Sequence, residues 1–191
     1  MPAFLIPAPE RVKQFADHLE FGARVLDVGT GSGVLAKLAF ERGVRDITAL
    51  DINPAAVEHT RKLLPTATVV HSNLFENVAG VFDTIIFAAP WSEGEIKTPF
   101  DHALYDCGVV ERFFRDAGPH LAEGGRIWLQ YCDAFPRNFQ RLQHWIHDNG
   151  FVIEASWTLS AWGQLVKRQV NIVLYEIARS SSPVRTADPG A

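Results

Sequence analysis

The sequence predicts an α/β fold in which helices cover both faces of a seven-stranded, mostly parallel sheet with an antiparallel last strand. Two observations carry this prediction. Short apolar runs alternate with helical patterns through most of the 191 residues, which is typical of repeated strand–helix units. Two further apolar runs, 151–159 and 170–177, follow one another without a helix between them, so these two strands must pair antiparallel.

The first predicted strand, residues 24–28, ends in a glycine-rich loop. The segment Asp27-Val28-Gly29-Thr30-Gly31-Ser32-Gly33 has the form D-x-G-x-G-x-G and leads into a helix predicted over residues 34–42. Glycines allow a tight turn and a close approach of the backbone to a ligand. The next strand, 46–50, ends at Asp51, where a carboxylate accepts hydrogen bonds from ribose hydroxyls. Together these features predict a Rossmann-like, nucleoside-binding half-sheet.

Asp27 distinguishes between two ligands that such a loop binds. The segment Gly31-Ser32-Gly33-Val34-Leu35-Ala36 also has the form G-x-G-x-x-A, which is a permitted dinucleotide fingerprint. Asp27 would add negative charge beside a pyrophosphate, whereas it suits a cofactor that carries an ammonium and a sulfonium. A buried carboxylate needs a partner, and we expect the cofactor ammonium or the loop amides to supply it. A dehydrogenase would also need a substrate domain, for which this chain leaves little room.

The remaining elements follow from apolar periodicity and from the positions of glycine and proline. Pro54 lies in the first turn of one helix, and Pro136 opens another that ends near Asn149. Residues 89–107 form an irregular stretch of a length that is more often functional than not. The predicted elements are helix 10–19, strand 24–28, helix 34–42, strand 46–50, helix 54–64, strands 68–71 and 81–88, helix 109–121, strand 126–131, helix 136–149 and strands 151–159 and 170–177. We expect one domain over 1–179 and a disordered tail over 180–191.

Composition limits the possible partners. The formal net charge of −4 and the absence of any run of four Lys or Arg residues make nucleic acid an unexpected partner. Cys107 and Cys132 form neither a zinc-binding nor a disulfide pattern, and no metal is expected. No apolar stretch reaches transmembrane length and residues 1–20 lack a secretion pattern, so we expect a cytoplasmic protein without a membrane partner. The oligomeric state is open.

The D-x-G-x-G-x-G segment resembles motif I of the class I S-adenosylmethionine-dependent methyltransferases. Other segments are similar to motifs of the release-factor glutamine methyltransferases and the wider small-domain group: Leu5-Ile6-Pro7-Ala8-Pro9-Glu10 to I-P-R-P-E-T, Ser72-Asn73-Leu74-Phe75 to S-D-L-F, Phe82-Asp83-Thr84-Ile85-Ile86 to F-D-L-I-V, and residues 106–125 to G-G-x-D-G…P-x-L-L-x-x-G-G. The resemblance implies an enzyme that binds S-adenosylmethionine. The residues it implies for the cofactor are Asp27, Gly29, Thr30, Gly31, Gly33, Asp51, Ile52, Asn53, Asn73, Leu74 and Ala88.

This group places its methyl acceptor at the tip of the strand predicted over 81–88. Many nitrogen methyltransferases carry N-P-P-Y or D-P-P-Y there, whereas this chain has Ala88-Ala89-Pro90-Trp91. The polar residue that holds an amide or exocyclic amine is therefore replaced by Ala88, and no stretch resembles the separate N-terminal helical domain of the release-factor enzymes. We expect an apolar mouth formed by Trp91, Phe100 and Trp162 that accepts a small molecule and methylates its nitrogen or oxygen. The catalytic candidates are Ala88, Pro90, Trp91 and His102, with His102 as a general base beside Asp101.

Two alternatives stay open. If Trp91 stacks on the target and a backbone carbonyl replaces the missing Asn, the acceptor is a protein glutamine or another macromolecular nitrogen. The loss of Asn at position 88 also admits a cofactor-binding protein without transfer activity that serves a partner subunit. Trp91 packing in its loop and His102 lying in solvent are the structural alternatives for these two side chains.

Overall fold

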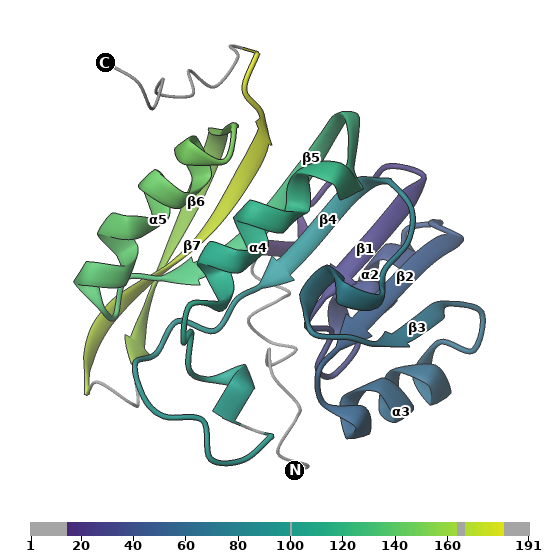
Figure 1. Cartoon of the computed structure of the whole chain (residues 1–191), viewed down its shortest axis with the longest axis horizontal. Coiled ribbons are helices and arrows are strands. Elements are labelled where there is room, and N and C mark those ends of the chain that lie inside the picture. Colours follow the sequence, from purple (N-terminus) through teal and green to yellow (C-terminus); the bar gives the residue numbers. More distant parts are fainter. Residues whose placement is uncertain (1–14, 100, 164–166, 182–191) are drawn as a thin grey trace, which may run out of the picture.

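The computed structural model describes residues 15–99, 101–163 and 167–181 (Figure 1). Most of the predicted opening helix, the segment at 5–10 and Phe100 lie outside these residues, as does the predicted tail from residue 182 onward. Within the described ranges, no helix is both long and apolar enough to cross a membrane. The cytoplasmic location and the single domain over 1–179 stay predictions.

Seven strands form one sheet in the order β3-β2-β1-β4-β5-β7-β6. Neighbouring strands from β3 to β5 are parallel, while β7 is antiparallel to both β5 and β6. The predicted sheet, including its antiparallel last strand, is therefore confirmed. The strands are β1 (Arg24–Val28), β2 (Asp46–Asp51), β3 (Thr68–His71), β4 (Phe82–Ala88), β5 (Leu121–Cys132), β6 (Phe151–Gly163) and β7 (Arg168–Arg179).

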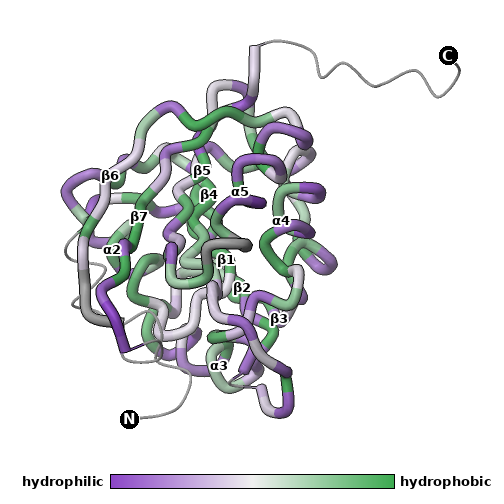
Figure 2. Tube along the Cα trace, turned by 90° about the vertical axis from the view of Figure 1, so that its left-hand side faces the viewer, coloured by the Kyte–Doolittle hydropathy of each residue, from purple (hydrophilic) through white to green (hydrophobic). Residues whose placement is uncertain are grey.

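Helices pack on both faces of the sheet, and each face has its own hydrophobic core. Figure 2 shows α2 and α4 on opposite sides of the strands. One core joins the sheet to α4 and α5 through side chains such as Phe113 and Leu142, and the other joins it to α2 and α3 through Leu35 and Val57. The helices are α2 (Val34–Glu41), α3 (Pro54–Leu63), α4 (Val109–Ala117) and α5 (Pro136–Asp148), with 3₁₀ turns at Leu74–Asn77, Asp101–Ala103 and Gly118–His120.

The region between α4 and β5 differs from the prediction. The helix expected to reach residue 121 ends at Ala117, since Gly118-Pro119 continues as a 3₁₀ turn and proline cannot extend the α-helical hydrogen bonding. Residues 123–125, which lie between the predicted helix 109–121 and the predicted strand 126–131, are inside β5, where the strand register shifts against β4 and Gly124 has φ +71°. β6 and β7 are also longer than predicted, because their pairing continues to Gly163 and Arg168.

The sheet topology determines where a site can form. β1 lies between β2 and β4, and the chain crosses from one side of β1 to the other after β3. In open α/β sheets such a switch point leaves a crevice at the carboxyl ends of the strands. The glycine loop after β1, Asp51 at the end of β2 and Ala88 at the end of β4 all lie at this edge.

Candidate functional site

The loop between β1 and α2 has a conformation that requires glycine. Gly29, Gly31 and Gly33 have φ values of +64°, +52° and +72°. A Cβ atom on Gly33 would lie 2.9 Å from Leu63 Cδ2, so a side chain there would also collide with α3. The loop is held to the next strand by the Thr30 amide, which donates to the Leu50 carbonyl at 2.8 Å. These contacts fix the backbone where a ligand is expected to approach.

Asp27 is buried beneath this loop and is 1% exposed. Its Oδ2 accepts hydrogen bonds from the Thr30 hydroxyl at 2.7 Å and from the Ala36 amide at 3.1 Å. Its Oδ1 is buried with no hydrogen-bond partner among the described residues. Desolvation raises the pKa of Asp27 to about 7, although the two hydrogen bonds oppose that rise. The loop therefore supplies hydrogen bonds to one oxygen of the buried carboxyl group, while the other oxygen has no partner among the described residues.

Asp51 connects the end of β2 to the glycine loop. Its Oδ2 accepts from the Gly31 amide at 2.9 Å and its Oδ1 accepts from the Asn53 amide at 2.8 Å. Burial raises the pKa of Asp51, and these bonds together with the nearby His102 and His71 oppose the rise. A carboxylate has about four lone-pair positions, so both oxygens keep room for ribose hydroxyls.

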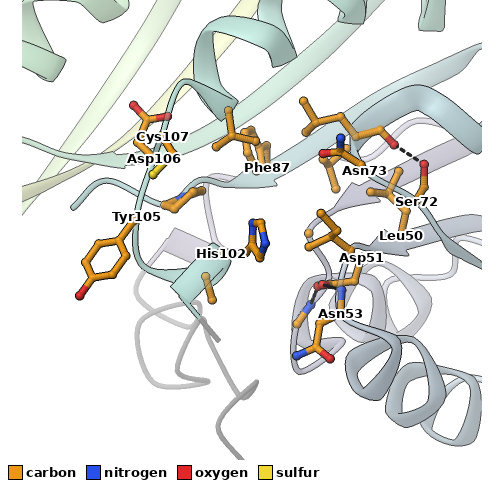
Figure 3. Close-up of a pocket in the computed structure, with 18 of the residues that line it drawn as sticks. Leu50, Asp51, Asn53, Ser72, Asn73, Phe87, His102, Tyr105, Asp106 and Cys107 are labelled. Carbon is orange, nitrogen blue, oxygen red and sulfur yellow. Dashed lines mark hydrogen bonds between the residues drawn. The ribbon is translucent and has the colours of Figure 1, made fainter. Parts of the chain in front are cut away.

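A cavity of about 130 Å³ opens at this edge of the sheet (Figure 3). Figure 3 shows Asp51 and Asn53 at one end and Asp106 and Cys107 at the other, with His102 between them. The predicted site residues that line it are Gly29, Gly31, Asp51, Ile52, Asn53, Asn73, Leu74, Ala88, Pro90 and His102. Sequence reasoning missed other lining residues: Val28, Leu50, Ser72, Phe87, Ile96, Pro99, Ala103, Tyr105, Asp106, Cys107, Val109 and Arg112.

Four predicted residues are not among those that line the cavity. Asp27 and Thr30 are buried behind the loop, and Gly33 packs against α3. Trp91 is half-buried, packs against both hydrophobic cores and lies with its ring 6.4 Å from that of Phe135. Its position fits the structural alternative of loop packing.

The turn after β3 is held by its own polar side chains. The Ser72 hydroxyl donates to the Leu74 carbonyl at 2.7 Å and accepts from the Asn77 amide at 3.0 Å. The Asn73 side-chain nitrogen donates to Glu76 Oε1 at 2.6 Å. The Asn73 side-chain oxygen takes no part in this contact. If Asn73 contacts the cofactor as the resemblance implies, this oxygen is the atom able to accept from an adenine amino group.

The stretch 92–107 folds back on itself beside the cavity. The Ser92 amide donates to the Leu104 carbonyl at 2.9 Å, and the Asp106 amide donates to the Ser92 carbonyl at 3.0 Å. Asp101 Oδ2 accepts from the Lys97 and Thr98 amides, and the Lys97 amide bond is the leading cause of the lowered pKa of Asp101. Asp101 thus stabilises the loop, and His102 faces Asp51 at the cofactor end.

The model of the methyltransferase small domain matches residues 12–155, well over half of the chain. The chain belongs to this family. A Methanocaldococcus jannaschii relative named as a protein N5-glutamine methyltransferase is 32% identical over 117 residues, covering 55% of this chain and 59% of the relative. Ribosomal RNA small subunit methyltransferase C of Escherichia coli O1:K1 is 36% identical over 128 residues, covering 61% of this chain and 35% of the relative. This small-domain methyltransferase therefore spans about a third to three fifths of the length of these relatives.

Solved structures share the fold of this small-domain methyltransferase. A methyltransferase from Pyrococcus furiosus superposes with a TM-score of 0.69 at 20% identity, covering 92% of this chain and 86% of that one. The tRNA (uracil-54, C5)-methyltransferase of Pyrococcus abyssi, in complex with S-adenosyl-L-homocysteine, gives 0.60 at 18% identity, covering 88% and 37%. The family match and the shared fold confirm the predicted class, that of the S-adenosylmethionine-dependent methyltransferases. S-adenosylmethionine is the cofactor of this family.

Two predictions about partners are wrong. The relatives are named for protein glutamine and for ribosomal RNA, which are macromolecules, so neither the small-molecule acceptor nor the expectation that nucleic acid is an unlikely partner stands. The first prediction relied on Ala88 and on the lack of a stretch that resembles the N-terminal helical domain of the release-factor enzymes, although a backbone carbonyl can also hold an amide. The second relied on the net charge of the whole chain, which does not describe the field at one edge of a sheet.

Proposed function

We propose that this small-domain methyltransferase transfers the methyl group of S-adenosylmethionine to a nitrogen atom of a macromolecule, and that a side-chain amide of a protein is the leading acceptor. The family match over residues 12–155, joined to a cavity in which the glycine loop meets Asp51, is the observation that carries this proposal. The relative named as a protein N5-glutamine methyltransferase supports the choice of acceptor.

The cavity has groups that fit each part of the cofactor. Asp51 would accept the ribose hydroxyls, and the Asn73 carbonyl oxygen would accept from the adenine amino group. The Asp27 Oδ1 has no hydrogen-bond partner among the described residues, and an ammonium on the other side of the loop would favour the charged form of this carboxyl group. Gly29 and Gly31 have no side chains, which leaves space beside the loop for the methionine part of the cofactor.

Alignment is the main task of the protein in such a transfer. The bound cofactor supplies a methyl group attached to a positively charged sulfur, which makes the methyl carbon a ready electrophile. The end of β4, at Ala88 and Pro90, lies against the same cavity and would orient the acceptor nitrogen. The backbone is fixed there because the Ala89 amide donates to the Gln130 carbonyl at 3.1 Å.

A second candidate acceptor is a nitrogen of ribosomal RNA. The relatives named ribosomal RNA small subunit methyltransferase C favour it, at 33–36% identity. An RNA acceptor would need basic groups for its phosphates, whereas a protein amide would not. The charge around the acceptor end of the cavity therefore distinguishes the two candidates.

Isotope transfer tests the proposal directly. The protein is incubated with methyl-tritiated S-adenosylmethionine and with separate protein and RNA pools from cells that lack its gene. We expect label in the protein pool that acid hydrolysis releases as methylamine, as it would from N5-methylglutamine. Label in RNA nucleosides would favour the second candidate. Label in neither pool would contradict the proposal.

A further inference from the structure

One wall of the cofactor cavity is formed by the part of the stretch 92–107 that lies farthest from its two ends. We call residues 95–99 and 101–103 the tip of this stretch. Figure 3 shows His102, which belongs to the tip, between the Asp51 end and the Asp106 end of the cavity. The tip residues that line the cavity are Ile96, Pro99, His102 and Ala103. The tip thus lies across the place where the cofactor is expected.

The tip is joined to the rest of the protein through a neck, which consists of residues 92–94 and 104–107. Two backbone hydrogen bonds join these two segments. A Cβ atom on Gly94 would lie 2.5 Å from Tyr105 Cε1, so the segments also pack directly against one another. Asp106 accepts hydrogen bonds from two backbone amides in the first turn of α4. The neck is therefore fixed to the body of the protein.

The tip is held together by its own hydrogen bonds. Asp101 Oδ2 accepts from the Lys97 amide at 2.8 Å, from the Thr98 amide at 2.6 Å and from the Thr98 hydroxyl at 2.9 Å. Among the described residues, every hydrogen bond and ion pair of the tip joins it to itself or to the neck, and none joins it to the glycine loop, β2 or α3. The tip can therefore move about the neck as one unit without losing a hydrogen bond.

The cavity beside the tip is too small for the cofactor. Its volume is about 130 Å³, whereas cavities that enclose ligands of drug size, such as a nucleoside joined to an amino acid, measure about 300–1,000 Å³. On the opposite side of the cavity, the glycine loop and Asp51 are held by hydrogen bonds to backbone groups. The tip has no such bonds to the sheet, so it is the side of the cavity that can make room.

Two features favour the return of the tip once the cavity is filled. Ile96 is 39% exposed although it lines the cavity, so a cofactor beside it would remove apolar surface from water. His102 lies near enough to Asp51 for its charge to oppose the rise in the pKa of that carboxyl group. Both contacts form at the cavity and not at the neck, so they stabilise the closed position alone.

We propose that the tip is a lid, which lifts about the neck to admit S-adenosylmethionine and to release S-adenosylhomocysteine and which lies closed during methyl transfer. Lids exclude water from a reaction, and their opening often limits the release of product. This inference goes beyond the proposed function and depends only on the cofactor of the family, so it holds for a protein acceptor and for an RNA acceptor alike.

The alternative is that the tip is a fixed wall of the cavity. Asp101→Ala distinguishes the two, because it removes the hydrogen bonds that hold the tip together and Asp101 does not line the cavity. Glu95→Ala is the matched control, since Glu95 lies in the same tip and forms only an exposed ion pair with Lys97. Gly94→Ala loosens the neck instead, by forcing a Cβ atom against Tyr105.

The experiment measures the binding of tritiated S-adenosylhomocysteine by rapid filtration. In the wild-type protein, the association rate should level off as the ligand concentration rises, because the opening of the lid becomes limiting. Asp101→Ala should raise both this plateau and the dissociation rate about tenfold, and should therefore change Kd less than either rate. Bound S-adenosylhomocysteine should also slow the hydrogen exchange of the tip amides about tenfold or more, and leave that of α5 unchanged.

The outcomes separate the lid from the proposed function. If the wild-type association rate rises linearly with concentration, or if neither Asp101→Ala nor Gly94→Ala changes the rates, the tip is a fixed wall. Equal effects of Asp101→Ala and Glu95→Ala would also overturn the lid. Should Asp101→Ala not fold, the same two rates in Gly94→Ala decide. A lack of methyl label in every macromolecule would contradict the proposed function and leave the lid standing, because the binding rates require no acceptor.

Discussion

The cofactor end of the site and the loop that follows β4 differ in how completely their polar groups are hydrogen bonded. At the cofactor end, Asp51 binds two backbone amides within 3 Å and Asp27 binds a hydroxyl and an amide through one oxygen. In the loop that follows β4, the Ser92 hydroxyl has no partner among the described residues and Asp106 Oδ2 has one contact at 3.5 Å. The cofactor end is therefore held in place by its own hydrogen bonds, whereas the loop that follows β4 leaves two polar groups incompletely bonded.

The largest expected effect concerns the pH dependence of stability, which the buried carboxyl group of Asp27 sets in part. Because the pKa of Asp27 is about 7 in the folded protein and about 3.9 when unfolded, the native state binds more protons between these values. The free energy of unfolding should therefore fall as pH rises from 4 to 7, by about 3 kcal/mol for this group. Urea titrations of Asp27→Asn, which cannot ionise, should lack this part of the slope. An identical pH dependence in wild type and variant would contradict the burial argument.

Asp51→Ala removes the acid at the tip of β2. We expect S-adenosylhomocysteine to bind about 100-fold more weakly, since hydrogen bonds to a charged group contribute about 1.5–3 kcal/mol. Calorimetric titration measures the change. Asp46→Ala is the matched control, because Asp46 is an exposed acid at the start of the same strand. Equal affinity in both variants would remove Asp51 from the cofactor site.

Gly33→Ala tests how tightly the loop is built. A side chain there would combine a φ of +72° with a contact of 2.9 Å to Leu63, and should cost about 2 kcal/mol of unfolding free energy. Gly43→Ala has φ +97° but meets nothing within 4 Å, so it should cost about 1 kcal/mol, from backbone strain alone. Urea unfolding compares the two. A larger cost at Gly43 would mean that the contact with α3 relaxes freely.

The smallest effect is expected at the acceptor end, for Trp91→Phe. Trp91 packs against the cores and Phe135, so the variant should lose about 1 kcal/mol of stability with little change in methyl transfer. Trp157→Phe, on a ring that packs against Trp128 at 5.8 Å, is the matched control for stability. A rise in acceptor KM confined to Trp91→Phe would restore its predicted contact with the target.

Sequence reasoning missed several lining residues in the stretch 92–107, and the reason is physical. The glycine loop, Asp51 and Asn73 are placed by local geometry, in which strand ends and positive φ values have clear residue signatures. The stretch 92–107 is instead folded by contacts such as Ser92 with Leu104, which no spacing reveals. The sequence therefore did not indicate that Tyr105 and Arg112 line the cavity, and no motif marked either residue. Asp106 was marked, since it begins the segment that resembles G-G-x-D-G, but a helix cap gives the same pattern.

The acceptor class illustrates the limit of single-residue arguments. Ala88 removed one expected hydrogen-bonding group, and the prediction moved from macromolecules to small molecules on that basis. The fold brings Ser92 and Asp106 to the same edge through a loop that returns on itself. The identity of one strand residue therefore does not show which polar groups the rest of the chain brings to this edge.

The strand order has a consequence for how the protein is made. β7 lies between β5 and β6, so β6 has no partner in the sheet until β7 has been inserted beside it. During synthesis β6 leaves the ribosome before β7 does, and β5 remains an open sheet edge in that interval. The amino-terminal half can pair its parallel strands during translation, whereas the sheet is completed only when residues 168–179 have emerged. The newborn chain therefore passes through a stage in which a long, apolar strand edge is exposed to other proteins.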